Sequence, residues 1–308
     1  MGEDAFLNFK GKTWENESSA LLTDETAGVS GVGGWIRFLS NNSKQQIIGG
    51  YNAATKTGPA FSRIQIQNNL GVELTGSNAK VRREVLFSDG HIYLNDNTMV
   101  VGDNNPGIIS GYDSTKYFIT ANTPGLGILV RENVRTSDGR VDFPIGTSIN
   151  SFTPSAIRNV SAPGDDYYAT VVDSVRDNLI NGNNLQTRGV NKTWEIGKLS
   201  ADLNGEIEVF LQHVITEEGS IFQANRNKAF VSAYTPGGWD IGYPQSLPDD
   251  GYLTTGNILT GSGTNRRLAD NMVGTSFYFS KFTGTGDSLN TKLWFNAYRV
   301  NPAIVKAY

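Results

Sequence analysis

The stretch LGILVRENVRTSDGRVDFPIG, residues 126–146, marks the point where the character of this sequence changes. It contains a short apolar run, residues 128–130, and then the pair Asp138-Gly139, which favours a turn because glycine tolerates positive φ. Residues 141–145 alternate as one face of a strand does, and Pro144 cannot donate to a ladder, so this strand is expected at a sheet edge. The stretch predicts the end of one domain, residues 1–131, and the first strand of a second, residues 132–308.

The composition is typical of a folded protein rich in turns. Among 308 residues there are 35 glycines and only 18% charged residues, while apolar residues are spread along the whole chain. The net charge of −4 argues against a nucleic-acid-binding protein, which would need a basic face. The absence of cysteine excludes disulfide scaffolds, thiolate metal sites and cysteine nucleophiles.

The sequence shows no membrane span and no leader. No apolar run approaches the ~20 residues that cross a bilayer, and residues 1–4 have neither a basic nor an apolar leader region. A strand-like segment follows at once, in residues 5–9. We therefore expect a processed or excised piece, and the route of export stays open.

Residues 1–131 predict a β-solenoid. Short apolar segments of three to six residues recur about every 8–12 residues, and Asn- and Gly-rich links between them accept the left-handed conformations of sharp corners. A meander or a sandwich is the alternative. The expected core side chains, each in the middle of a strand, are Phe38, Ile66, Leu74, Leu94 and Val101.

Residues 132–308 predict an antiparallel β-sandwich, which makes the whole chain all-β. Its strand-like segments are longer and alternate clearly, as in residues 206–212 and 276–283. Trp194 is expected between the two sheets, and residues 236–250 read as a long loop at one end. Two stretches are candidates for helix: residues 168–179, whose β-branched side chains favour a strand instead, and residues 265–273, which could form one or two turns.

Several segments resemble the repetitive stalks of large Bacteroidota cell-surface and secreted proteins, the class that uses the type IX secretion system and includes gliding-motility adhesins. GRVDFPIGT at 139–147 resembles the segment that follows such stalks, and VNKTWEI at 190–196 resembles a strand of the sandwich module behind it. The stalk-like segments are WIRF at 35–38, KQQIIGG at 44–50, FSRIQIQNN at 61–69, GHIYL at 90–94 and NTMVVG at 97–102. The resemblance implies an extracellular, non-enzymatic protein. The family usually also carries a signal peptide and a C-terminal sorting domain, which this sequence does not show.

Metal-binding candidates are few. His91 and His213 are far apart in the sequence and are expected to be strand residues rather than ligands. Adjacent carboxylates in turn-like sequence are usually solvated, as expected for Glu217-Glu218, but such pairs can also bind Ca²⁺ through oxygen ligands. The candidates for Ca²⁺ are Asp165, Asp166, Asp249 and Asp250.

Two features bear on carbohydrates. Exposed aromatic rings stack on sugars, and the candidates for glycan contact are Trp239, Tyr243 and Tyr252, although such rings often pack within their own loop. The dense charges at Lys80, Arg82, Arg83 and Glu84 read most simply as a solvated face rather than as a catalytic groove. A carbohydrate-binding or carbohydrate-cleaving secreted protein is therefore the alternative to a structural role.

The N-terminal end of the expected solenoid carries aromatic side chains with no obvious cap. Phe6, Phe9 and Trp14 would lie on an open coil, whose backbone groups and core need a cover. We expect that residues 1–14 form an interface, either with a second copy in a head-to-tail fibre or with the rest of a longer stalk.

Overall fold

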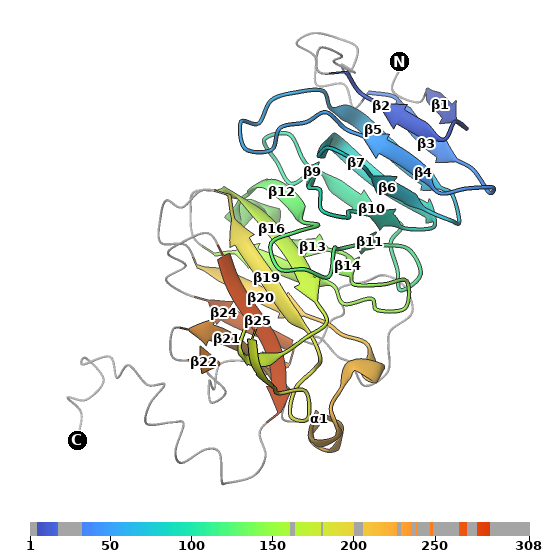
Figure 1. Cartoon of the computed structure of the whole chain (residues 1–308). Helices are drawn as coiled ribbons and strands as arrows, with labels where there is room; N and C mark the ends of the chain where they lie inside the picture. The colour runs from blue at the N-terminus through green and yellow to red at the C-terminus, as the bar shows by residue number, and fades with distance from the viewer. Residues whose placement is uncertain are drawn as a thin grey trace, which may run out of the picture.

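The computed structural model is built almost entirely of β-strands, with one short α-helix, α1 (Ser220–Ala224), in the part of the chain it describes (Figure 1). Two single turns of 3₁₀ helix accompany it, η1 (Thr136–Asp138) and η2 (Ile215–Glu217). The described residues are 5–17, 33–160, 164–179, 181–199, 206–226, 229–235, 238–239, 247–248, 265–269 and 276–283.

The N-terminal half alternates between two parallel sheets. Each strand pairs with the one two places along the chain, so that Phe6 lies beside Trp35 and Trp35 beside Arg63. The first sheet holds β1 (Phe6–Phe9), β3 (Trp35–Leu39), β5 (Phe61–Gln67), β7 (Ala79–Asp89), β9 (Met99–Val101) and β12 (Leu129–Val134), with β10 (Ile108–Ser110) also paired to β7. The second holds β2 (Thr13–Glu15), β4 (Gln45–Ile48), β6 (Val72–Leu74), β8 (Ile92–Tyr93), β11 (Phe118–Ile119) and β14 (Ile145–Gly146).

Close approach of successive corners explains two of the glycines. A Cβ at Gly49 would lie 2.2 Å from the carbonyl oxygen of Asn78. Gly90 has a φ of +74°, and a Cβ there would lie 1.9 Å from the carbonyl oxygen of Asn68. The strands can therefore stack at sheet spacing only because these corners carry no side chain.

Strand β12 joins the two halves of the molecule. It pairs in parallel with β9 on one side and antiparallel with β16 (Asp165–Val172) on the other, so one 12-stranded sheet runs through both halves. The predicted boundary between residues 131 and 132 falls inside this strand. The turn predicted after it is present, with Gly139 at a φ of 66°. The expected edge position around Pro144 is confirmed, since β13 (Arg140–Phe143) and β14 are both terminal strands of their sheets.

The C-terminal half is antiparallel. The large sheet continues from β16 through β19 (Thr193–Lys198), β25 (Ser276–Thr283), β21 (Ala229–Thr235) and β22 (Gly238–Trp239). A five-stranded sheet contains β13, β15 (Ser155–Asn159), β20 (Ile207–Leu211), β24 (Asn265–Ala269) and β23 (Leu247–Pro248). The hairpin of β17 (Arg176–Asn178) and β18 (Asn181–Asn184) follows β16.

One cluster of buried side chains takes residues from all three large sheets. The five expected core residues of the N-terminal half and Trp194 are all 0% exposed and belong to this cluster, which confirms their predicted burial. Packing is thus continuous from the parallel into the antiparallel half.

Two details of the sequence-based prediction are wrong. Residues 265–269 form strand β24, where a turn or two of helix was expected, and helix α1 was not expected at all. The segment 236–250, expected as one long loop, contains the two-residue strands β22 and β23, while its other residues lie outside the described part of the chain. In the described part, no helix has the length and apolar character to cross a membrane.

Candidate functional site

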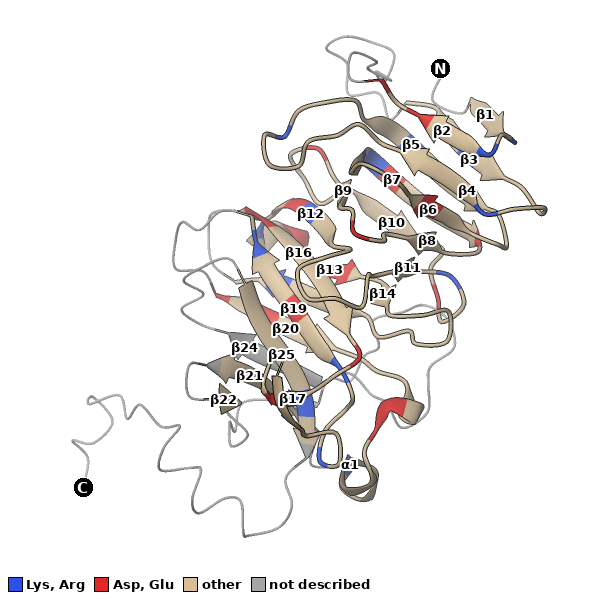
Figure 2. Cartoon of the chain, viewed as in Figure 1, with Lys and Arg blue, Asp and Glu red and all other residues tan. Residues whose placement is uncertain are grey.

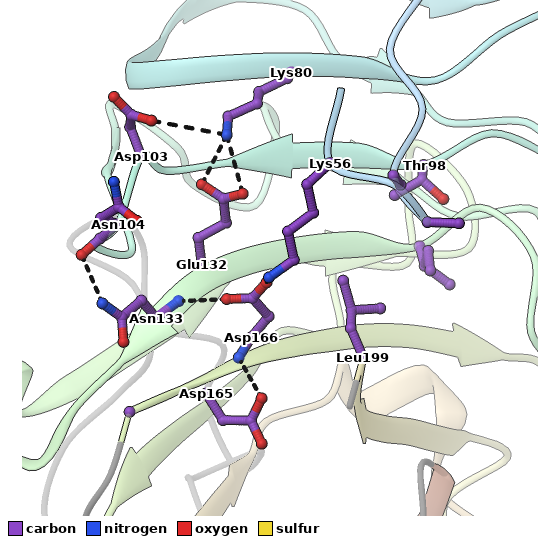
Figure 3. A pocket seen from close by; sticks show the side chains of 14 residues that line it. Lys56, Lys80, Thr98, Asp103, Asn104, Glu132, Asn133, Asp165, Asp166 and Leu199 are labelled. Carbon is purple, nitrogen blue, oxygen red and sulfur yellow. Dashed lines mark hydrogen bonds and ion pairs between the residues drawn. The ribbon is translucent and has the colours of Figure 1, made fainter. Parts of the chain in front are cut away.

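A cavity of about 740 Å³ lies where the parallel half meets the antiparallel half. Its walls come from six separated segments: the loop after β4, strand β7, the residues around β9, strand β12, the start of β16 and the residue after β19. Charged side chains from these segments converge on it, as Figure 3 shows for Lys56, Lys80, Asp103, Glu132 and Asp166.

Ion pairs organise the cavity wall. The Nζ atom of Lys80 lies 3.0 Å from Oε2 of Glu132 and 3.9 Å from Oδ1 of Asp103. The Nζ atom of Lys56 lies 2.6 Å from Oδ2 of Asp166, whose other oxygen accepts a hydrogen bond of 2.8 Å from the backbone N–H of Asn133. Lys80 therefore pairs with a carboxylate on β12, and Lys56 pairs with a carboxylate on β16, which belongs to the antiparallel half.

Burial changes the proton affinities around these pairs. Desolvation raises the pKa of Glu132 above its usual value, an effect that Lys80 partly opposes. Burial and the nearby carboxylates, Glu132 foremost, also raise the pKa of Tyr51. The pKa of Lys56 is raised chiefly by its hydrogen bond to Asp166. Burial thus favours the protonated form of Glu132.

The cavity is suited to a small polar ligand. It offers carboxylate acceptors, lysine donors and the amides of Asn104 and Asn133, and it has apolar patches at Ile128 and Leu199. Such mixed polar and apolar walls fit a polyhydroxylated molecule better than a hydrophobic one. Among the residues described, no group of three or more His, Cys, Asp or Glu side chains is arranged to hold a metal ion.

The expected Ca²⁺ ligands are only partly visible. Asp165 and Asp166 lie at the start of β16, beside the cavity, and each is paired with a lysine: Lys198 Nζ lies 3.3 Å from Oδ2 of Asp165. Asp249 and Asp250 lie outside the described residues. Calcium binding by these four residues therefore stays a prediction.

The expectation of a solvated pair at Glu217-Glu218 is wrong. The Glu218 side chain is 0% exposed, and its oxygens lie 3.0 Å from Nε2 of His213 and 2.7 Å from Nε of Arg226. His213 follows β20 and is itself buried, which lowers its pKa well below the usual value. His213, Glu218 and Arg226 thus form a polar cluster beside α1, where the ring of His213 contacts Phe222. Glu218 is buried within this cluster and does not lie in a solvated turn.

His91 was expected within a strand but lies directly before β8, outside it. It is buried against the ring of Tyr117, with ring centroids 4.6 Å apart, and desolvation lowers its pKa to about 4. This environment favours a neutral imidazole inside the fold.

Trp239, one of the expected glycan contacts, is not an exposed ring. Its side chain is buried, its ring packs against Phe282 and Tyr234, and its indole N–H donates to the backbone oxygen of Arg176 over 2.5 Å. The ring thus packs within the fold, which was the alternative expected for such side chains. Tyr243 and Tyr252 lie outside the described residues.

The basic group on β7 is not the solvated face that was expected. The side chain of Lys80 is only 11% exposed, and Arg82 donates from Nε to Asp103 over 3.0 Å. Figure 2 shows acidic and basic positions together on the strands around the cavity. At the start of β7, Lys80 and Arg82 alternate with Ala79 and Val81, and this alternation indicates that the two charged side chains share one face of the strand. The sequence does not show which part of the chain covers that face.

The predicted interface residues lie at the N-terminal edge of both parallel sheets. Phe6 is 47% exposed and stacks on Trp35, whereas Phe9 and Trp14 are half-buried and pack against the main core. Strands β1 and β2 are the last strands of their sheets in the part of the chain described.

Comparisons with known protein families, with curated proteins and with solved structures found nothing that matches this chain.

Proposed function

We propose that this chain is a non-enzymatic structural or adhesion protein of the cell surface or extracellular space, which assembles head to tail through its N-terminal strands. The observation that carries the proposal is that β1 and β2, at the same end of the molecule, are the last strands of their two parallel sheets within the described residues (Figure 1). An uncovered strand edge is a template for another strand.

The side chains at this edge support a contact rather than a solvated surface. Phe6 and Leu7 are neighbours on β1 and are 47% and 44% exposed. A strand edge that faced only water would favour polar side chains at these positions. The guanidinium of Arg37 lies 4.2 Å from the centre of the Phe6 ring, which holds that ring in place. A strand added beside β1 would cover both apolar side chains.

The alternation between two parallel sheets is what a β-solenoid requires, and the two antiparallel sheets around Trp194 are what a β-sandwich requires. We interpret them as a stalk and a following module. The resemblance to type IX secreted surface proteins of Bacteroidota supports the same arrangement and an extracellular location.

Sedimentation velocity of the intact chain tests the assembly. We expect oligomers whose size grows with concentration and changes little with salt, because strand pairing and apolar burial are not screened. The chain lacking residues 1–14, and the variant Leu7→Glu, should both sediment as monomers. Ile149→Glu is the matched control, since Ile149 is 52% exposed but lies away from β1. A monomeric intact chain at every concentration would contradict the proposal.

A second candidate function is carbohydrate binding or cleavage, which the cavity of Figure 3 favours. Four carboxylates and two lysines line it, and Glu132 is a potential proton donor. Calorimetric titration with neutral and acidic oligosaccharides would measure binding, and release of reducing ends would measure cleavage. Asp103→Asn should weaken binding, whereas Asp113→Asn, outside the cavity, should not. Absence of any heat of binding across both sugar classes would remove this candidate.

A further inference from the structure

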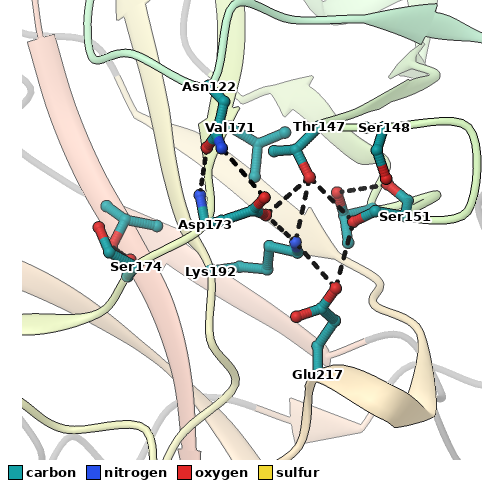
Figure 4. Close-up of polar contacts among 12 residues, drawn as sticks. Asn122, Thr147, Ser148, Ser151, Val171, Asp173, Ser174, Lys192 and Glu217 are labelled. Carbon is teal, nitrogen blue, oxygen red and sulfur yellow. Dashed lines mark hydrogen bonds and ion pairs between the residues drawn. The ribbon is translucent and has the colours of Figure 1, made fainter.

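Lys192 lies in a fully buried position with two carboxylates around its amine (Figure 4). Its side chain is 0% exposed. The Nζ atom contacts Oδ1 of Asp173, lies 3.0 Å from Oε1 of Glu217 and lies 3.2 Å from Oγ1 of Thr147. Three separate segments therefore deliver a lysine, an aspartate and a glutamate to one point.

The pairing of β16 with β19 brings Lys192 and Asp173 close together. In the antiparallel pair of β16 and β19, the last matched residues are Val172 and Thr193. Asp173 directly follows the end of β16 and Lys192 directly precedes the start of β19, so each lies one residue beyond this last matched pair. Their side chains meet because of the backbone pairing and not through a flexible loop.

The Asp173 carboxyl group is held in one orientation. Its Oδ1 accepts a hydrogen bond of 2.6 Å from the hydroxyl of Thr147, and its Oδ2 accepts one of 3.1 Å from Nδ2 of Asn122. The backbone N–H of Asp173 also donates to Asn122, over 2.6 Å. Donors on both oxygens can stabilise negative charge that develops on this carboxyl group.

We infer that Lys192 and Asp173 condense to form an intramolecular amide bond, with Glu217 as the group that transfers a proton. The bond forms between Nζ of Lys192 and Cγ of Asp173, and the bond from Cγ to Oδ1 breaks. Two protons leave the Nζ ammonium, one of them carried by Glu217, and Oδ1 departs with both as water. Oδ2 becomes the amide oxygen, beside Nδ2 of Asn122. The step needs no oxidant, reductant or other reactant.

The surroundings favour this condensation over a permanent ion pair. The fold holds the amine of Lys192 next to the carboxyl group of Asp173, so the two groups react as if each were present at a very high concentration. Full burial of Lys192 makes a free ammonium costly, while the 35% exposure of the Asp173 side chain gives the released water a way out. The product would link the ends of β16 and β19 and close the segment that contains the β17–β18 hairpin.

Intact-mass spectrometry of the purified, denatured full chain tests the inference directly. We expect the wild-type mass to be lower than the sequence mass by one water molecule, and a tryptic map to contain one branched peptide that joins the Lys192 and Asp173 segments. Lys192→Arg keeps the positive charge but cannot form this amide, so its mass should equal its sequence mass. It also keeps every Asp-Gly pair, so water lost through succinimide formation would occur in both proteins.

Glu217→Gln separates chemistry from folding. We expect this variant to give the wild-type circular dichroism spectrum but to remain largely unlinked. A wild-type chain at its full sequence mass, with trypsin cleaving after Lys192 in the denatured protein, would overturn the inference and leave a buried ion pair. This result does not depend on assembly through β1, and each proposal can fail without the other.

Discussion

Replacement of Trp194 by alanine should destabilise the chain by about 3–5 kcal/mol. The side chain is 0% exposed and belongs to the core shared by the parallel and antiparallel halves. On β19 it lies between Val171 of β16 and Phe279 of β25, so neighbouring strands on both sides prevent collapse into the vacated volume. The effect should therefore reach the upper part of that range.

A hydrogen bond adds to this loss. The indole N–H of Trp194 donates to the backbone oxygen of Thr153 over 2.9 Å, in a buried place. Leaving that oxygen without a donor costs about 1–3 kcal/mol. Trp194→Phe keeps most of the ring volume and loses the donor, so it should cost that smaller amount.

Urea unfolding followed by far-UV circular dichroism measures both variants without relying on the fluorescence of the residue that is changed. The midpoint should fall with an unchanged slope, because the surface exposed on unfolding stays the same. If Trp194→Ala lies within about 1 kcal/mol of the wild type, or if the two variants have equal midpoints, the shared core is not organised around this side chain.

Three further predictions concern single buried positions. Ile66→Asp would bury an unpaired charge and should abolish the folded state, whereas Gln67→Asp, exposed on the same strand, should change the melting temperature little. Burial lowers the pKa of His91 to about 4, so between that value and about 6.5 the unfolded chain binds more protons than the folded chain. The stability of the wild type should therefore fall as the pH drops through this window. His91→Asn should lose less stability there, which melting temperatures measured over a pH series would show. Burial lowers the pKa of Lys281 to about 7, so stability should rise with pH from about 7 towards 10.5, and Lys281→Met should flatten that rise in urea titrations at each pH.

Much of the N-terminal half could be predicted from the sequence. The strands at Val72–Leu74 and Met99–Val101 have the bounds that the apolar segments indicated, and the corners between strands carry Asn and Gly as expected. Local information suffices there because each short strand is apolar and each corner needs a conformation that few residues adopt. Helix α1 was missed because its five residues include Ile221 and Phe222, and Gly219 before it provides no side-chain cap.

The candidate site could not be predicted in the same way. Lys56, Lys80, Asp103, Glu132 and Asp166 come from five elements, and the offsets between paired strands vary from 20 residues for Ala79 and Met99 to 30 for Met99 and Leu129. An irregular offset gives no repeat from which to align charged residues. Alternation along a strand shows which side chains share a face, but not that another part of the chain closes over that face.

The same stacking has a mechanical consequence. In the parallel half, the hydrogen bonds between strands run across the strands at a slant, so they point broadly along the direction in which strands are added. Tension along that direction would separate one strand after another, starting from β1 and β2. Each freed segment of 20 to 30 residues would then lengthen the molecule by about 70–100 Å. A force–extension trace with steps of that size is the expected signature. Such a chain would yield gradually under load and dissipate work, while the antiparallel half beyond β12 stays folded as an anchor.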